Sequence, residues 1–439
     1  MIEKVRRIAH QILNSGKKLP LQVCIRSKKG ILARFTNNGV HQNGFQDLFS
    51  YTVRLLGNNR FICSESNDFS EQGIRQMMTV IVPQGLSRSD GKKSINGIAS
   101  ATFKTPLPDD KRGAHPQIKE YFPFSLGKVP EMAAQAIEEG LDLIRQEKAS
   151  ANGYYSAYER LFYLTDSRGL ELFHPATAVR FGTTITKGAG KGYFSFYHPN
   201  PKKLKVASVV KEAIQLAEEA SAREVSVKPG EYECIFSPRT FLELIEPLRH
   251  HFDSHLYQEG KSALSGSLGK RIFSEAFTLS DDVTNPGQFG VPFDSEGAEK
   301  RKVVLVKRGV LNGLLEEGNS TRGIREYPTY PENLVAEPGN VDLANLFKRI
   351  KRGIFINKVR YHTLVREAGL EITGLATAGS LYIENGCVLG RVGHLRYHDS
   401  LFGILRSICG RTKERILLKD GEGGAALFPY FLISKLRVV

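Results

Sequence analysis

The amino-acid sequence predicts an α+β fold, in which a mixed sheet with helices forms the N-terminal half and a β-rich domain follows. Before residue 225, apolar residues repeat at helical spacing in several long segments, and strand-like runs lie between them. From Glu231 onward, short strand-like runs separated by glycine-containing turns dominate. We therefore divide the chain into an N-terminal α/β region, 1–225, and a C-terminal β-rich domain, 226–439, with 1–85 and 115–225 as candidate subdomains of the first.

The first 85 residues predict a meander of strands between two helices. Apolar residues recur at helical spacing from Ile2 to Ile12, which predicts an amphipathic N-terminal helix. A second helix is expected to start from a cap at Asn67 or Asp68. Turn signals lie at 28–30, 37–39 and 57–59, so the expected elements are strands 21–26, 31–35, 48–56 and 60–63 and helix 69–82.

Residues 83–127 are rich in proline, glycine, serine and lysine, and we interpret them as a long excursion or linker. The next segment repeats apolar residues from Met132 to Ile144 at helical spacing. The turn Asp166-Ser167-Arg168-Gly169 then separates two strand-like runs. The expected elements are helix 128–148, strands 154–165 and 171–186, and helix 206–222.

The C-terminal half is expected to consist mainly of strands. The pair Asn385-Gly386 favours a tight hairpin turn. One helix is expected over 341–352, with Asn340 as its N-cap and Gly353 as its stop. No period of about 20–50 residues recurs, so we do not expect a solenoid. The expected strands are 232–236, 277–279, 302–306, 310–315, 370–376, 380–384 and 387–392.

The composition is that of a globular protein, with 41% hydrophobic and 24% charged residues. No apolar run approaches the roughly 18 residues of a membrane span. The N-terminus lacks the apolar core and cleavage site of a signal peptide, so we expect a cytoplasmic protein. The cysteines form no CxxC and are odd in number, which indicates neither a disulfide framework nor a cysteine zinc site: Cys24, Cys63, Cys234, Cys387 and Cys409.

The net charge of +15 raises the question of nucleic-acid binding. No helix-turn-helix, RNP-like or zinc-finger pattern accompanies the charge, and aromatic residues do not alternate with the basic ones. Cations in a last helical turn also stabilise the helix dipole. We therefore favour a solvated basic surface over a nucleic-acid site for the densest cluster: Lys348, Arg349, Lys351, Arg352, Lys358 and Arg360.

Three of the eleven histidines, His250, His251 and His255, follow the helix-like run 240–248. Imidazole is a common zinc ligand, and the i, i+4 spacing of His251 and His255 places two rings on one helix face. Helical metallopeptidase motifs also place a glutamate beside the first histidine as general base, and no carboxylate stands there. We therefore favour a histidine-rich helix end without metal, with His250 and His255 as the alternative metal pair.

Two further patterns indicate turns. The glycine-rich run 187–192 lacks the GxxxxGK[ST] spacing of a P-loop and does not clearly join a strand to a helix. The acids in 281–282 and 293–297 could bind a divalent cation or act in acid–base chemistry. Aspartate and glycine also suit turns, and the EF-hand spacing is absent. We therefore favour turns both for the glycine-rich run and for the acidic segments.

Several segments carry recognisable motifs in a fixed order along the chain. They are 34–42, close to the pattern "RFANNxIxQ", 165–169, close to an "NSxG" turn, 260–269 with "GxSxxxGxLG", then 281–282, 293–297 and 309–311, and 382–386, close to a "YxIENG" hairpin. Together these segments resemble the TldD/PmbA family, also called the modulator-of-DNA-gyrase family. The similarity spans nearly the whole chain, and the order of the motifs is more specific than any single one.

The resemblance implies cytosolic processing of peptides. In the TldD-type branch, HExxxH and a distant C-terminal cysteine bind zinc; the PmbA/TldE-type branch lacks these ligands and pairs with the first. Here His250 and His255 keep the outer spacing, but His251 replaces the glutamate. The stretch from His255 to Gly260 is too short for the metal-bearing branch, the tail 420–426 has no cysteine, and Cys409 lies too early. The chain therefore resembles a PmbA/TldE-type subunit.

From this resemblance we expect a subunit of a peptide-processing metallopeptidase system, without a metal or cofactor of its own. Its expected partner is a TldD-type paralogue, in which zinc is expected, or a second copy of this chain as a dimer. One alternative is an active metallopeptidase with an unusual histidine site. A second alternative is a basic regulator associated with nucleic acid. Metal content separates the first two hypotheses, and salt-dependent DNA binding tests the third.

Overall fold

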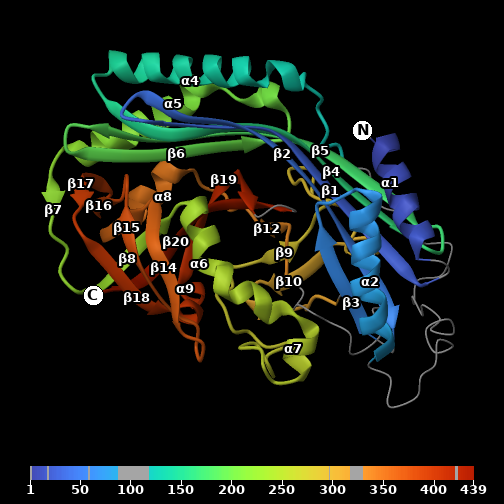
Figure 1. Ribbon diagram of the computed structural model, residues 1–439. Helices are drawn as coiled ribbons and strands as arrows, with labels where there is room; N and C mark the ends of the chain where they lie inside the picture. Colours follow the sequence, from blue (N-terminus) through green and yellow to red (C-terminus); the bar gives the residue numbers. More distant parts are fainter. Residues whose placement is uncertain are drawn as a thin grey trace.

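The computed structural model describes residues 2–16, 19–57, 60–87, 118–295, 297–316, 330–420 and 424–439. In these ranges the chain forms a long six-stranded sheet and a 14-stranded sheet, with helices packed on both (Figure 1). The predicted α+β class is confirmed. None of the helices among the described residues combines the length and the apolar character that a membrane span requires.

The first sheet has the strand order β3-β2-β1-β4-β5-β6. Every pairing in it is antiparallel, whereas we expected a mixed sheet in this half. The pairing is antiparallel because short turns join most neighbouring strands, and such a turn reverses the direction of the chain. Its strands are β1 (Leu21–Thr36), β2 (Gly39–Gly57), β3 (Arg60–Ser66), β4 (Ser150–Asp166), β5 (Glu171–Lys187) and β6 (Gly190–His198).

The expected turn at 28–30 is wrong, because β1 runs through it as one strand. Lys28 pairs with both Leu48 and Arg160, so the ladder is continuous on either side. Gly30 is required by close packing: a Cβ there would lie 2.1 Å from the carbonyl oxygen of Ala157 on the next strand. The turn at 37–39 is confirmed, with Asn37 and Asn38 both at positive φ.

Helices cover one face of this sheet, and the C-terminal half lies against the other (Figure 1). Alternate β1 residues from Ile31 to Phe35 pack under α4 and α5, and those from Leu21 to Ile25 pack with α1 and α2. The predicted helices are therefore found in order. Their bounds, with two 3₁₀ turns, are α1 (Ile2–Ser15), α2 (Glu71–Ser87), η2 (Leu126–Lys128), α4 (Val129–Gln146), η3 (Pro201–Lys203) and α5 (Val206–Ser221).

The second sheet contains both parallel and antiparallel pairs. The long strand β20 is its centre, since it pairs with β8, β12, β18 and β19. Helix α6 packs over this region in the largest core cluster. The strands are β7 (Glu224–Val225), β8 (Gly230–Phe236), β9 (Leu279–Asp281), β10 (Val303–Lys307), β11 (Val310–Leu311), β12 (Leu334–Ala336), β13 (Arg352–Ile356), β14 (Lys358–Arg366), β15 (Glu371–Thr377), β16 (Leu381–Glu384), β17 (Cys387–Val392), β18 (Leu395–Ser400), β19 (Ile408–Asp420) and β20 (Gly424–Val438).

The helix expected over 341–352 is shorter than predicted. It is α8 (Leu343–Arg349), and Asp342, not Asn340, caps it by accepting the N–H of Asn345 at 2.8 Å. Arg352 already begins β13, which pairs with β8 and β16, so sheet pairing ends the helix early. The remaining short helices are α6 (Pro238–Arg249), η4 (His250–Phe252), α7 (Ser254–Gln258) and α9 (Leu401–Arg406).

The domain boundary near residue 225 stays a prediction. Strands from both candidate subdomains, 1–85 and 115–225, join in the one six-stranded sheet. Of the expected excursion 83–127, residues 88–117 lie outside the described residues. Where the chain resumes, Glu120 is buried between Arg160, at 2.7 Å, and His174, at 2.8 Å. These charges keep the pKa of the Glu120 carboxyl below its ordinary value despite burial.

The loop around Phe293 joins the two halves. Phe293 is 1% exposed and packs with Cys24, Leu164 and Leu172 on the face of the first sheet opposite the helices. The turn predicted at 293–297 is present: the Asp294 carboxylate accepts the N–H of Ala298 at 2.9 Å, and Gly297 takes a positive φ. Glu296 of this pattern lies outside the described residues.

We expect Asp294→Ala to lower the free energy of unfolding by about 1–2 kcal/mol, because the N–H of Ala298 loses its acceptor. Urea unfolding measures the effect, with Asp142→Ala as the control, since that carboxylate is largely exposed on α4. A variant as stable as the wild type that loses peptide processing in a reconstituted pair contradicts this structural role.

Candidate functional site

The histidine cluster lies at the C-terminal end of α6, in the helix-like run that the sequence predicts. The Ser237 hydroxyl caps the start of α6 by accepting the N–H of Thr240 at 3.2 Å, and Pro238 occupies its first turn. The apolar face of α6 is buried in the main core. Its last residue, Arg249, is also buried and donates to the carbonyl oxygen of Pro331.

The helix does not continue through the histidines. After the 3₁₀ turn η4, Asp253 is extended, and its carboxylate accepts the N–H groups of His255, at 2.8 Å, and Leu256, at 2.9 Å. Leu315 exchanges backbone hydrogen bonds with Phe252 and Ser254 on either side of this residue. Asp253 is thus the N-cap of a new helix, α7, and two short elements replace one long one.

The expectation that His251 and His255 share one helix face is therefore wrong. His250 lies edge-on to the ring of Tyr330, with ring centroids 5.3 Å apart. His255 is half exposed and pairs with Glu259, the C-cap residue of α7, at 3.2 Å. Only His251 is buried, at 6% exposure. The three rings thus have three different environments.

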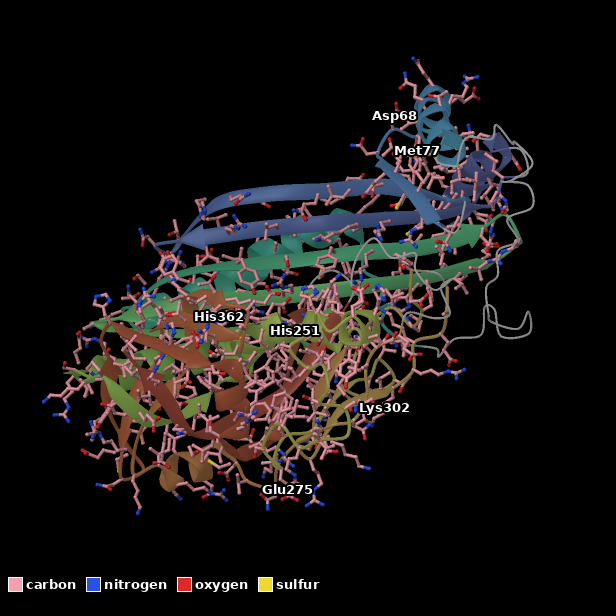
Figure 2. The ribbon with its side chains drawn as sticks, turned by 90° about the horizontal axis from the view of Figure 1, so that it is seen from below. Asp68, Met77, His251, Glu275, Lys302 and His362 are labelled. Carbon is pink, nitrogen blue, oxygen red and sulfur yellow. The ribbon has the colours of Figure 1, made fainter. Side chains whose placement is uncertain are left out.

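His251 is held by the loop that follows α7. Its Nδ1 accepts the N–H of Ala263 at 3.0 Å, and its carbonyl oxygen accepts the Ser262 hydroxyl at 2.7 Å. Burial lowers the pKa of the ring, with Glu367 opposing and His250 adding to the shift. The ring therefore stays neutral at pH 7. Figure 2 shows His251 within the C-terminal half.

Within the described ranges, no group of three or more His, Cys, Asp and Glu side chains is placed to hold a metal ion. Cys24, Cys234, Cys387 and Cys409 are free thiols, and Cys409 lies on β19. Tail residues 421–423 lie outside the described residues. The assignment of no metal, and the alternative pair His250 and His255, stay predictions.

The other predicted acids form turns or enter a partly buried charge cluster. The Asp282 carboxylate accepts the N–H and hydroxyl of Thr284, at 3.1 and 2.7 Å, as the turn prediction requires. Asp281, on β9, accepts the N–H of Asn333 at 2.7 Å and lies near the ion pair of Lys300 with Glu332. No sequence signal links these segments, which the second sheet brings together.

Burial raises the pKa of Asp281 from 3.8 to about 6, although Lys300 opposes the shift. Because the folded state favours the protonated carboxyl, this contribution to stability is complete below about pH 4 and is lost as the pH rises through about 6. Relative to Asp281→Asn, we expect the wild type to lose at most about 3 kcal/mol of unfolding free energy over that range. Urea unfolding of both proteins at several pH values checks this, and parallel pH profiles contradict it.

Two residues of the basic cluster contact tyrosines that lie far away in the sequence. Arg352 stacks on Tyr232, with 4.9 Å to the ring centroid, and donates to its hydroxyl at 2.9 Å. Lys358 lies 3.7 Å from the ring centroid of Tyr193, and burial lowers the pKa of its ammonium. These contacts inside the chain account for two of the six cations, which supports a structural role for them.

The glycine-rich run 187–192 is the β5–β6 hairpin, as predicted, with Lys187 paired to Gly190. Its glycines let α5 approach the sheet. A Cβ at Gly190 would lie 2.0 Å from the carbonyl oxygen of Ala217, and one at Gly192 would lie 2.0 Å from that of Ala213. The glycines of this run therefore allow α5 to pack closely on the sheet.

Comparison with known proteins gives one family match. Residues 229–439 match the family described as PmbA/TldA metallopeptidase C-terminal domain. A metalloprotease of Methanothermobacter thermautotrophicus is 25% identical over 219 residues, which are 44% of this chain and 48% of that protein. A zinc metalloprotease TldD homolog of Saccharolobus solfataricus is 28% identical over 149 residues, which are 29% of this chain and 32% of that protein. The chain thus spans at most about half the length of these relatives.

The crystal structure of TldE from Thermococcus kodakarensis has a similar fold over the whole chain. The TM-score is 0.80 at 18% sequence identity, and the match covers 100% of this chain and 99% of that one. This similarity extends the shared fold to the N-terminal half, which the matched C-terminal domain does not cover.

Proposed function

The chain belongs to the PmbA/TldD metallopeptidase family, as its motifs indicated, and from this premise we propose that it is a PmbA/TldE-like subunit of a cytosolic peptide-processing system. In this proposal the chain has no zinc site of its own and acts with a TldD-type partner. The observation that carries the proposal is the break of the helix at Asp253, which leaves the three histidines in separate environments.

Peptide hydrolysis by a metallopeptidase needs a metal with about three protein ligands and a base for the bound water. His251 occupies the position at which the family resemblance implies the glutamate base. Its Nδ1 is already bound to the N–H of Ala263, and burial keeps the ring neutral. His255 pairs with Glu259, the C-cap residue of its own helix. These contacts of His251 and His255 support the proposal that the partner, and not this chain, activates the water.

A role in binding extended peptides has a structural basis in β14. This strand pairs only with β15 among the described strands, so its other edge has no strand partner there. Tyr361, Leu364 and Val365 are exposed along it, and Tyr361 sits at a register shift with a positive φ. Extended peptides bind such edges through backbone hydrogen bonds. Arg360, which is exposed on the same strand, favours acidic peptides, whereas Arg366 is already paired with Glu371.

Zinc analysis tests the missing metal site. We expect the purified chain to hold well under one zinc per chain, and the chain purified together with a TldD-type paralogue to hold about one per pair, all of it in the paralogue. About one tightly bound zinc in the isolated chain contradicts the proposal if it is lost in His250→Ala or His255→Ala and kept in His394→Ala, a control at an exposed histidine.

A further inference from the structure

A cavity of about 410 Å³ opens beside the end of α6. Its walls come from three segments that are far apart in the sequence. The loop after α7 contributes Lys261 and Ser267, the turn between β14 and β15 contributes Glu367, and α9 contributes Phe402 and Arg406. The volume lies within the range of about 300–1,000 Å³ that is usual for small-molecule sites.

Backbone hydrogen bonds hold the walls in place. The N–H of Leu401 donates to the carbonyl oxygen of Leu370 at 2.9 Å, which ties α9 to the turn between β14 and β15. The N–H of Ser274 donates to the carbonyl oxygen of Leu405 at 3.1 Å, and Arg406 Nε donates to that of Ile272 at 2.9 Å. The fold therefore builds the cavity, since α9 is hydrogen-bonded both to the turn between β14 and β15 and to the loop after α7.

His251 supplies a hydrogen-bond donor from the inner wall. Because its Nδ1 accepts the N–H of Ala263, the neutral ring carries its proton on Nε2. The ring lines the cavity, and no acceptor among the described residues meets Nε2. Burial lowers the pKa of the ring, so this N–H donor is present at neutral pH.

The charged groups of the lining have both signs. Arg406 Nε donates to the backbone, and its guanidinium lies over the Phe402 ring, 5.9 Å from the ring centroid. Its terminal nitrogens form no hydrogen bond or ion pair with the described residues. Lys261 is exposed and pairs with Glu259 at the rim, at 2.9 Å. Glu367 forms no hydrogen bond or ion pair through its side chain in the described part of the chain, and it is close enough to oppose the lowering of the His251 pKa by burial. A guanidinium binds carboxylates through two parallel hydrogen bonds, and a carboxylate accepts N–H groups.

We propose that this cavity binds an α-carboxylate with a neighbouring N–H group, which is the chemistry shared by a peptide C-terminus and a free amino acid. Arg406 and the His251 N–H bind the carboxylate, Glu367 accepts the N–H, and Phe402 with Ile272 contacts the side chain. The inference rests on the proposed peptide-processing function and adds a site for the end of the substrate or for a released product. Its test is binding to the isolated chain, so it can fail while cleavage by the pair succeeds.

The test is a calorimetric titration of the isolated chain with N-acetyl-Ala-Phe, with the C-terminal amide of the same peptide, and with free phenylalanine. We expect the peptide acid to bind at least about tenfold more tightly than its amide. Tighter binding of the acetylated peptide identifies a peptide C-terminus as the ligand, and tighter binding of phenylalanine identifies a released amino acid. Equal binding of acid and amide, no binding of any probe, or equal binding of inorganic phosphate overturns the proposal.

Two variants assign the binding to this cavity. Arg406→Gln is expected to weaken binding of the acid about tenfold and to leave the amide unchanged. Arg271→Gln is the matched control. Arg271 is exposed, as Arg406 is, but it pairs with Glu275 and does not line the cavity. In His251→Asn, the amide oxygen can still accept the N–H of Ala263, but the Nε2 donor is lost. This variant should therefore also weaken binding of the peptide acid. Unchanged binding in Arg406→Gln overturns the proposal.

Discussion

An unstructured peptide is expected to be cleaved by this chain together with a TldD-type paralogue, and not by this chain alone. Zinc lowers the pKa of its bound water to near neutrality, and a positioned carboxylate removes the proton. In this chain His251 takes the place of that carboxylate and its Nδ1 is bound to Ala263. We expect the mixture to be at least about a hundredfold faster, the lower limit of what a general base contributes.

Two controls make this assay specific. A paralogue whose glutamate beside the first metal-binding histidine is changed to glutamine should abolish cleavage by the mixture. His250→Ala in this chain should leave the rate of the mixture unchanged, since this exposed ring lies edge-on to Tyr330 and does not line the cavity beside His251. Chelator-sensitive cleavage by this chain alone, at the rate of the mixture, reverses the assignment and supports the unusual histidine site.

The second large effect is on stability. Phe293→Ala is expected to lower the free energy of unfolding by about 3–5 kcal/mol, the usual cost of a buried phenylalanine. The ring is 1% exposed and packs against Phe162, with ring centroids 5.6 Å apart, where the loop meets the first sheet. Removing it leaves a cavity where the two halves of the chain meet.

Phe173→Ala is the matched control, because Phe173 lies on β5 of the same sheet but is 43% exposed. Its effect should stay within about 0.5 kcal/mol. Chemical denaturation of both variants gives the comparison. Equal losses in the two variants contradict the role of Phe293 as the buried contact between the halves.

Much of the fold was predictable because its long elements carry local signals. In α4, apolar residues repeat at helical spacing. The sequence Asn37-Asn38-Gly39 indicates the hairpin between β1 and β2, because asparagine tolerates the positive φ that such a turn requires. The family was also predictable, because the order of several motifs indicated it and the C-terminal match confirmed it. Strand β1 was divided wrongly, since the packing that requires Gly30 involves a strand more than a hundred residues away.

The histidine cluster shows the same limit at the site. Asp253-Ser254 is a helix-start signal, and it could have indicated the break between His251 and His255. The effect of the pairing with Leu315 could not be predicted, because that contact spans about sixty residues. The cavity beside His251 was equally hidden, since Glu367 and Arg406 lie more than a hundred residues further along the chain.

The sequence by itself determined the α+β class, most long helices, the hairpin turns and the family, because periodicity, turn residues and motif order are local properties. The tertiary structure alone decided which charges are partly buried together, such as Asp281 with Lys300 and Glu332, and which walls enclose His251. The physical reason is that burial and proximity, which shift pKa values and build cavities, arise only when distant segments pack together.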